Sequence, residues 1–229
     1  MKRDLDTVIV TGGASGLGAA VACAIASHGG TPVVLDRRPP PDGIEHELVD
    51  LADTAAAEAA VAAVADRHAG LDAVVTCAGT DVPAPLEQLD RESWERVVTV
   101  NLLATAATVR AALPALVAAR GTVVTVASTL GLRGAGDATA YCASKFGVIG
   151  FTRALAAETA GRVGVTLLVP GGMATAFFDG REERYRPPDD AALSPPAEVA
   201  DAVLYALTRP PGVEVRELVV CPSREPSWP

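Results

Sequence analysis

The sequence predicts an α/β fold: a single domain in which helices cover both faces of a mostly parallel sheet of about seven strands. Short β-branched runs alternate along the chain with longer Ala-rich segments that carry apolar residues at helical spacing. Apolar residues make up 49% of the chain and aromatic residues only 4%, so Ala, Val and Leu dominate the core. The length of 229 residues fits one three-layer domain, 1–229.

The first strand and the first helix are the most clearly marked elements. Residues 7–11 form an apolar run that ends at Gly12-Gly13, and an amphipathic helix follows until Gly29-Gly30 stops it. The later strands are expected at 31–35, 45–49, 73–76, 122–127, 163–169 and 216–221. The later helices are expected at 55–69, 94–120 with a bend at Pro114, 141–161 and 197–207. This order predicts βαβ units with right-handed crossovers.

Composition excludes several classes of function. The net charge is −9, and no basic run exceeds pairs such as Arg37-Arg38, which argues against a nucleic-acid partner. The four cysteines lie far apart without metal-ligand spacing, so we expect no metal site and no disulfide framework. We find no signal peptide and no apolar run that reaches the length of a membrane span, which predicts a cytoplasmic protein without a membrane partner.

A glycine-rich loop joins the first strand to the first helix. Glycines permit a tight turn and a close approach to a pyrophosphate, while the helix N-terminus offers free N–H groups and a positive dipole end. The spacing is Gly-x3-Gly-x-Gly, and no lysine follows as in a nucleoside-triphosphate loop. An ordinary turn is the plain alternative, but the position between strand and helix favours a dinucleotide site. Its candidate binding residues are Gly12, Ala14, Ser15, Gly16, Leu17 and Gly18.

Asp36 ends the second strand, where a carboxylate can accept hydrogen bonds from the adenosine ribose and would repel a 2′-phosphate. The neighbouring Arg37 and Arg38 act in the opposite direction, because guanidinium groups bind phosphate. We favour NAD(H) over NADP(H), and NADP(H) stays open.

Tyr141 and Lys145 are one turn apart in a predicted helix and share one of its faces. A free tyrosine titrates near pH 10, and a neighbouring ammonium group lowers that pKa by stabilising the phenolate. The pair therefore predicts a tyrosine that acts as a general acid or base. Taken alone, this spacing is also common in helices without a catalytic role.

Together the glycine-rich loop, Asn101, Ser128 and Tyr141-x-x-x-Lys145 resemble the short-chain dehydrogenase/reductase family in order and spacing, from Thr7 to about Cys221. The resemblance implies a Rossmann-type fold and an NAD(P)-dependent oxidoreductase. Such an enzyme transfers hydride between nicotinamide and a secondary alcohol or ketone, as an alcohol dehydrogenase or ketoreductase.

The resemblance also implies a role for each catalytic residue. Tyr141 exchanges a proton with the substrate oxygen, and Ser128 hydrogen-bonds that oxygen. Lys145 lowers the pKa of Tyr141 and holds the nicotinamide ribose, and Asn101 holds a water that links Lys145 to solvent. The remaining implied cofactor contacts lie beside the adenine and around the nicotinamide: Asp50, Leu51, Cys77, Ala78, Gly79, Pro170, Gly171, Gly172, Met173 and Thr175.

One residue departs from the family pattern, which has Asn-Ala-Gly where this chain has Cys77-Ala78-Gly79. The asparagine helps to tie the central strands, and cysteine is a weak hydrogen-bond partner. The departure puts local sheet stability in question but removes no catalytic group.

The irregular segment at about 172–196 is expected to be a substrate lid. The substrate-lining candidates are Leu130, Met173, Phe177 and Phe178. The lid arginines, Arg181, Arg184 and Arg186, suit a small molecule with a carboxylate or phosphate, or else form a solvated face.

Two other functions remain open: a catalytically silent NAD(P)-binding regulator or scaffold, and an epimerase or dehydratase that uses NAD internally. The resemblance further implies a homo-oligomer, a tetramer or dimer, formed through helices 94–120 and 141–161. Trp228 in the Pro-rich tail is a candidate docking residue on its own or a neighbouring subunit.

Overall fold

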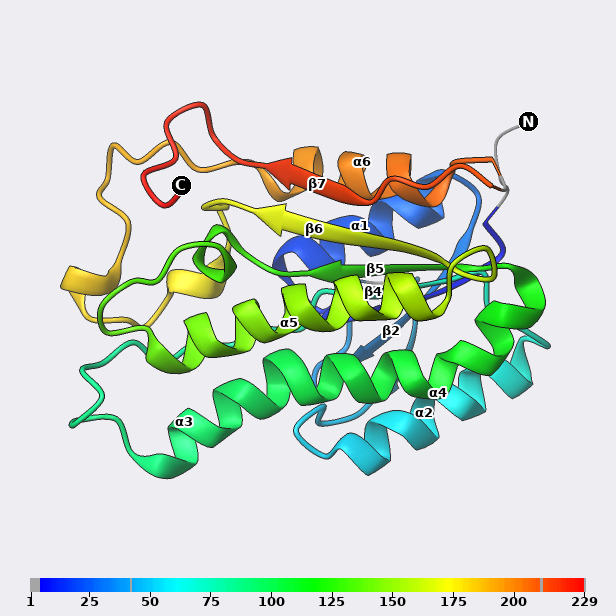
Figure 1. Ribbon diagram of the computed structural model, residues 1–229, viewed down its shortest axis with the longest axis horizontal. Coiled ribbons are helices and arrows are strands. Elements are labelled where there is room, and N and C mark those ends of the chain that lie inside the picture. Colours follow the sequence, from blue (N-terminus) through cyan, green and yellow to red (C-terminus); the bar gives the residue numbers. More distant parts are fainter. Residues whose placement is uncertain (1–4, 42, 211, 229) are drawn as a thin grey trace.

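A seven-stranded parallel sheet forms the centre of the molecule, with strand order β3-β2-β1-β4-β5-β6-β7 (Figure 1). The computed structural model describes residues 5–41, 43–210 and 212–228. The strands are β1 (Thr7–Thr11), β2 (Thr31–Asp36), β3 (Glu45–Leu48), β4 (Ala73–Thr76), β5 (Thr122–Val126), β6 (Gly164–Pro170) and β7 (Glu217–Val220). The predicted α/β class and the seven strands are thus confirmed.

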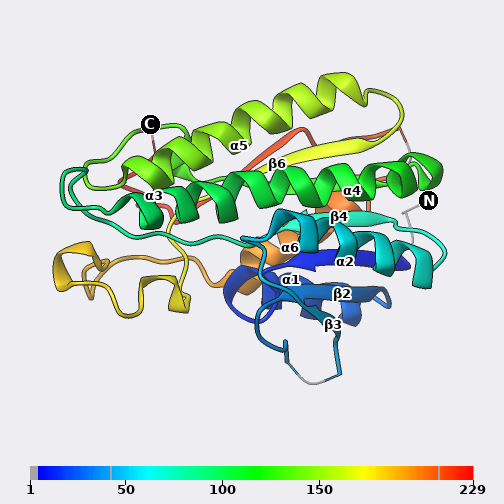
Figure 2. The ribbon, with the colours of Figure 1, turned by 90° about the horizontal axis from the view of Figure 1, so that it is seen from below.

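Helices cover both faces of the sheet and give the predicted three layers (Figure 2). Helices α1 and α6 pack together on one face, and α2, α4 and α5 cover the other. The helices are α1 (Gly16–Ser27), α2 (Thr54–Arg67), α3 (Arg91–Val98), α4 (Ala104–Ala119), α5 (Thr139–Glu158) and α6 (Pro196–Leu207).

The buried strands supply side chains to both layers at once. Val8 and Val10 of β1 pack into the core beneath α1 and α6, whereas Ile9 packs into the core beneath α2 and α4. Successive residues of a strand point to opposite faces, which explains why a strand buried on both sides reads as an uninterrupted apolar run.

The long helical stretch differs from its predicted bounds at its start and in its interior. It begins at Arg91, before the expected Trp94, because the Asp90 side chain accepts a hydrogen bond of 2.8 Å from the Ser93 N–H and caps the helix. A π-helical turn, η1 (Thr99–Leu103), separates α3 from α4. Helix α4 runs on through Pro114, so the irregularity lies at η1 and not at the proline.

The expectation that no apolar segment has the length of a membrane span was wrong. The continuous helix Arg91–Ala119 is long and apolar enough by length and composition alone. Its α4 part packs against α2 and against the strands β4 and β5. Ala, Val and Leu fill its sheet-facing side in the same way that they fill the strands.

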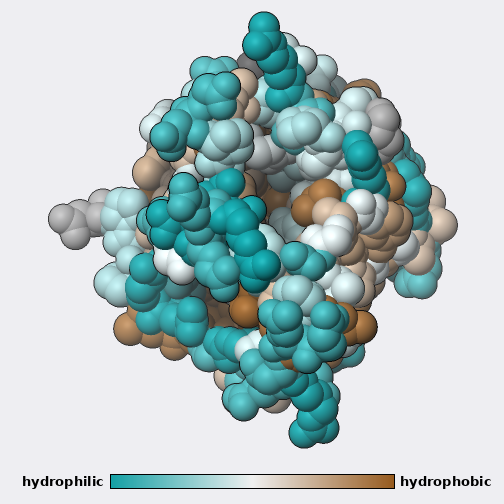
Figure 3. Space-filling view, turned by 90° about the vertical axis from the view of Figure 1, so that its left-hand side faces the viewer, coloured by the Kyte–Doolittle hydropathy of each residue, from teal (hydrophilic) through white to brown (hydrophobic). Residues whose placement is uncertain are grey.

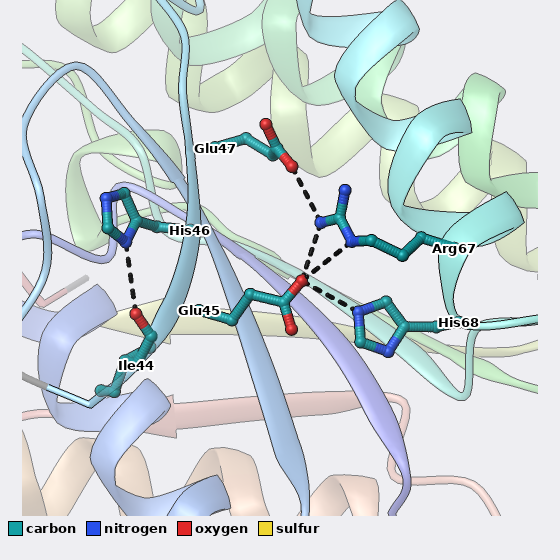
Figure 4. Close-up of polar contacts among 6 residues, drawn as sticks. All are labelled: Ile44, Glu45, His46, Glu47, Arg67 and His68. Carbon is teal, nitrogen blue, oxygen red and sulfur yellow. Dashed lines mark hydrogen bonds and ion pairs between the residues drawn. The ribbon is translucent and has the colours of Figure 1, made fainter.

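Strand β3 lies at one edge of the sheet and alternates exposed and half-buried residues. Figure 4 shows that Glu45 and Glu47 both lie against Arg67 of α2, at 2.7 and 2.8 Å, and that His68 lies 3.0 Å from Glu45. The hydrogen bond with His68 and the Arg67 guanidinium hold the pKa of Glu45 below its ordinary value. Charges along an edge strand discourage its pairing with another chain.

Candidate active site

The predicted site residues converge at the carboxyl end of the sheet. Strand β1 lies between β2 and β4, and the order of the strands along the sheet reverses at this point. Ligands of such sheets bind at the carboxyl ends of the strands where the order reverses. Figure 3 looks onto this end of the molecule and shows a hollow with an apolar floor, surrounded by hydrophilic side chains.

The glycine-rich loop packs so closely that two of its glycines cannot be replaced. A Cβ at Gly12, which has a φ of +70°, would lie 2.7 Å from the Ala78 Cα, and one at Gly18 would lie 2.2 Å from the Gly12 carbonyl oxygen. The Ser15 side chain does not cap α1, and the first turn of α1 holds no acid. The unsatisfied N–H groups of this helix end fit the phosphates of a dinucleotide.

Asp36 is held against the same loop. One of its oxygens accepts a hydrogen bond of 3.1 Å from the Ala14 N–H, and the other accepts one of 3.1 Å from the Arg38 N–H. The Arg38 side chain donates to Ser15 Oγ at 3.3 Å. The Asp36 carboxylate therefore lies against the glycine-rich loop at the end of β2.

Asp50 and Leu51, which the resemblance implies to lie beside the adenine, follow β3 at its carboxyl end. The N–H of Ala52 donates to Asp50 at 2.9 Å and Arg96 lies 3.3 Å away, so the pKa of the Asp50 carboxyl is lowered. Leu51 is buried in the core beneath α2. The positive charge of Arg37 also lowers the pKa of Asp50, so Arg37 lies near this carboxylate.

The structure brings three of the predicted catalytic residues together. Tyr141 is hydrogen-bonded to Ser128, which follows β5, and its ring centroid lies 5.7 Å from Lys145 Nζ. Lys145 Nζ donates to the Val126 carbonyl at 2.9 Å and is buried. The geometry leaves Ser128 and Tyr141 able to share one substrate oxygen.

Asn101, in η1, connects the loop after β4 to α5 through hydrogen bonds of its side chain. Its Oδ1 accepts from the Thr80 N–H at 2.8 Å, and its Nδ2 donates to the Thr80 carbonyl at 3.0 Å and to Ser144 Oγ at 2.9 Å. Its carbonyl oxygen accepts from Thr105 Oγ1 at 2.9 Å. The side chain thus ties the loop after β4 to α5 and fixes Lys145, the neighbour of Ser144.

The pKa of Tyr141 does not follow the expectation from the Tyr–Lys pair. Burial raises the pKa of Tyr141 to about 12, and the hydrogen bond with Ser128 only partly opposes this. Burial also lowers the pKa of Lys145 to about 8. The lowering of the Tyr141 pKa that the Tyr–Lys pair predicts is opposed here, because desolvation disfavours the phenolate.

Residues 172–196 lie beside Tyr141, which is half-buried. The Phe177 ring lies 5.8 Å from the Tyr141 ring, and the Tyr185 hydroxyl donates to Asp137 at 2.9 Å. The two ends of the segment are joined, since the Ser194 N–H donates to the Gly172 carbonyl at 2.9 Å. Phe178 packs edge-on against Phe177, so both predicted phenylalanines are present at this side of the site.

Other predicted residues lie around the same cluster. Thr175 reaches the glycine-rich loop, because a Cβ on Gly16 would meet its side chain at 3.5 Å. Leu130 follows Ser128 and donates its N–H to the Ser128 Oγ at 3.2 Å. Met173 packs against the core beneath α1 and α6. Pro170 ends β6 and leads into Gly171 and Gly172.

Cys77 follows β4 and lies near Lys145. Burial raises the pKa of its thiol to about 12, which leaves it protonated and unreactive. The tie between the central strands is made nearby, where the Ala78 N–H donates to Thr11 Oγ1 at 3.2 Å.

Three residues at the site, Glu225, Ser227 and Asp81, were not predicted from the sequence. Glu225, in the Pro-rich tail, accepts a hydrogen bond of 2.7 Å from the Gly172 N–H, and Ser227 of the same tail lies 2.6 Å from Thr129 Oγ1. Asp81 pairs with Arg181 of the segment 172–196. A signal existed for Asp81, which follows a strand at its carboxyl end, but nothing in the sequence links Glu225 to the site.

The titration of Lys145 is directly measurable, since the chain holds only two lysines, Lys2 and Lys145. With ¹³C-labelled lysine, we expect one Cε resonance to titrate near pH 8. Because this folded pKa lies below the value of an unfolded lysine, the folded state binds fewer protons between these two pH values. The free energy of unfolding should therefore rise with pH in that window. Lys145→Met removes the resonance, and titration near pH 10.5 would contradict the burial argument.

The sequence is similar to those of known proteins. The family model described as short chain dehydrogenase matches residues 6–186. An uncharacterised oxidoreductase of Staphylococcus aureus is 30% identical, over 93% of this chain and 96% of its own length. Glycine betaine reductase of Emericella nidulans is 30% identical over 95% of this chain, which spans only 19% of that protein.

A solved structure gives the same picture at the level of the fold. The alcohol dehydrogenase of Thermococcus sibiricus, complexed with 5-hydroxy-NADP, superposes with a TM-score of 0.84 at 25% identity. The match covers 94% of this chain and 96% of the archaeal chain. With the family model matching most of the sequence and a relative of equal length named an oxidoreductase, the chain belongs to the short-chain dehydrogenase family of oxidoreductases.

Proposed function

We propose that this protein is an NAD(P)-dependent dehydrogenase or reductase that interconverts a secondary alcohol and a ketone. The observation that carries the proposal is the contact of Tyr141 with Ser128 and its closeness to Lys145, at the sheet end that also presents the glycine-rich loop. The two neighbouring hydroxyls could both donate hydrogen bonds to one carbonyl oxygen of the substrate, which would stabilise the negative charge that develops on it.

The residues divide the work as follows. A bound nicotinamide supplies or accepts the hydride. In reduction, the Tyr141 hydroxyl gives its proton to the substrate oxygen while Ser128 holds that oxygen. In oxidation, Tyr141 takes the proton back. Lys145 holds the cofactor ribose, and Asn101 keeps the lysine-bearing turn of α5 in place through Ser144.

The dinucleotide is NAD(H) in preference to NADP(H). The support is the fixed Asp36 carboxylate, whose hydrogen bond from the Ala14 N–H keeps negative charge beside the ribose position. The archaeal alcohol dehydrogenase of similar fold is complexed with 5-hydroxy-NADP, so the choice between the two cofactors needs a test on this chain.

Residues 172–196 act as a lid on a single domain spanning 1–229, and the enzyme works in the cytoplasm on a small molecule. The closed contacts of Phe177 and Tyr185 support the lid. Tyr141 is only half-buried, and movement of the lid would control how substrate reaches it.

The proposal is tested by following NADH and NADPH absorbance with a panel of ketones, and the corresponding alcohols with the oxidised cofactors. Net consumption of cofactor, equal to the alcohol formed, supports it. Tight cofactor binding without net consumption would instead favour a regulator, or an enzyme that returns the hydride to its own substrate.

The protein should form a homo-oligomer, a dimer or tetramer, through its outer helices. Leu103 of η1 and Phe146 of α5 are large apolar residues that remain 50% and 46% exposed. We expect Phe146→Glu with Leu103→Glu to reduce the sedimenting mass to that of one chain. Tyr205→Glu, at a residue 53% exposed on the opposite helical layer, is the matched control and should leave the mass unchanged. A monomeric wild type would refute the interface.

A further inference from the structure

A charged pair lies beneath the lid, outside the catalytic cluster. The side chains of Asp81 and Arg181 are 6% and 12% exposed, and Arg181 Nη2 lies 3.3 Å from Asp81 Oδ2. The guanidinium is stacked on two rings, 4.5 Å from the centroid of Phe177 and 5.0 Å from that of Phe178. Stacking and burial fix the orientation of the arginine.

This pair leaves hydrogen-bonding capacity unused. Among the residues that the structure describes, Asp81 Oδ1 and Arg181 Nη2 have no hydrogen-bond partner. Buried polar atoms are almost always satisfied, so an unmet acceptor beside an unmet donor calls for a partner from outside the chain. Burial raises the pKa of Asp81, and the guanidinium opposes that rise.

The Asp81–Arg181 pair lies near Tyr141, which we propose to bind the reacting oxygen. Phe177 contacts Tyr141 on one side and Arg181 on the other. The charges of Asp81 and Arg181 also act on the Tyr141 hydroxyl. A substrate held at Ser128 and Tyr141 would therefore extend towards the pair when the lid closes.

The charges at this place do not favour an anion. Arg181 is neutralised by Asp81, and Arg184 is held by Glu182 at 2.9 Å. Arg186 donates to the Arg181 carbonyl at 2.7 Å. The three lid arginines that suggested a carboxylate or phosphate are thus engaged, and the Asp81 carboxylate would repel such a group.

We infer that the Asp81–Arg181 pair binds a hydroxyl group of a neutral, polyhydroxylated substrate, next to its reacting carbonyl or carbinol carbon. The hydroxyl donates to Asp81 Oδ1 and accepts from Arg181 Nη2, which satisfies both atoms at once. The inference rests on the proposed function, and it assigns the substrate class as hydroxy ketones and polyols.

The test compares three ketones with the same number of non-hydrogen atoms: erythrulose (both enantiomers), 2-heptanone and levulinate. For the wild type, we expect kcat/KM for one erythrulose enantiomer to exceed that for either other ketone by about 10-fold or more. An apolar or anionic substrate leaves the pair unpaired or repelled. A preference for levulinate or 2-heptanone would overturn the inference.

Substitutions test whether Asp81 and Arg181 cause the preference for erythrulose. Asp81→Leu with Arg181→Met replaces the buried pair by apolar groups, a change that such pairs tolerate, and should invert the ratio of erythrulose to 2-heptanone. Glu182→Leu with Arg184→Met, an exposed pair on the same lid, should leave the ratio unchanged. Asp81→Asn, which frees the guanidinium charge, should raise the levulinate rate relative to erythrulose. If Asp81→Leu with Arg181→Met leaves the ratio of kcat/KM for erythrulose to that for 2-heptanone unchanged, the role of the pair is refuted.

A binding measurement separates this inference from the proposed function. If none of the three ketones is reduced, calorimetric titration of the NADH-loaded protein compares threitol with 2-heptanol. Tighter binding of threitol, lost in the Asp81→Leu/Arg181→Met variant, supports the hydroxyl site without any turnover. Equal or weaker binding of threitol overturns it.

Discussion

Replacing Tyr141 by Phe should lower kcat for ketone reduction by about 10²- to 10⁴-fold, the range that a positioned general acid contributes. The variant keeps the ring that packs against Phe177 and removes only the hydroxyl that bonds to Ser128. The fold and the affinity for NADH should therefore hold. Stopped-flow kinetics and NADH fluorescence titration measure the two quantities.

Tyr185→Phe is the matched control. Tyr185 belongs to the segment 172–196 and also has a hydrogen-bonded hydroxyl, which donates to Asp137, but it lies outside the cluster of Tyr141, Ser128 and Lys145. Its loss should change kcat far less than the loss of the Tyr141 hydroxyl. Equal effects of the two substitutions would show that Tyr141 serves only to close the lid.

Asp36→Asn should raise kcat/KM for NADPH relative to NADH by about 10²-fold, because it removes the charge that opposes a 2′-phosphate. The amide oxygen still accepts from the Ala14 N–H, while the hydrogen bond from the Arg38 N–H to the second carboxylate oxygen is lost. The flanking Arg37 and Arg38 then face the phosphate without competition.

The control for this change is Glu47→Gln, which removes one acidic charge from the neighbouring strand β3 while Glu45 still holds Arg67. Steady-state kinetics with both cofactors give the ratio for each variant. A wild type that already prefers NADPH, or a ratio that Asp36→Asn does not move, would contradict the NAD assignment.

The alternation of apolar runs and Ala-rich helices was enough to predict the fold. Val8, Ile9 and Val10 are buried on both faces of the sheet, so their uninterrupted run marks a central strand. The bounds were less predictable where a side chain decides them. Asp90 extends the long helix towards its start, and the π turn at Asn101 has no apolar pattern of its own.

The site followed from the sequence where its residues come directly after strands. Ser128, Asp36 and the glycine-rich loop share the carboxyl end of a parallel sheet, so their meeting is a consequence of topology. Contacts between distant segments were not predictable, as with Asp81 and Arg181, or with Glu225 and Gly172. The raised pKa of Tyr141 depends on desolvation, which residue spacing does not reveal.

The most direct measurement of the central claim is the transfer of deuterium from NADH labelled at the nicotinamide C4 position. The protein is mixed with either C4 epimer of the labelled cofactor and the ketone panel, and the alcohols are analysed by mass spectrometry. We predict deuterium at the carbinol carbon from one epimer alone, in amounts equal to the NADH consumed, and its loss in Tyr141→Phe. Unlabelled products, or label that appears without net NADH consumption, would contradict an oxidoreductase acting on alcohols and ketones.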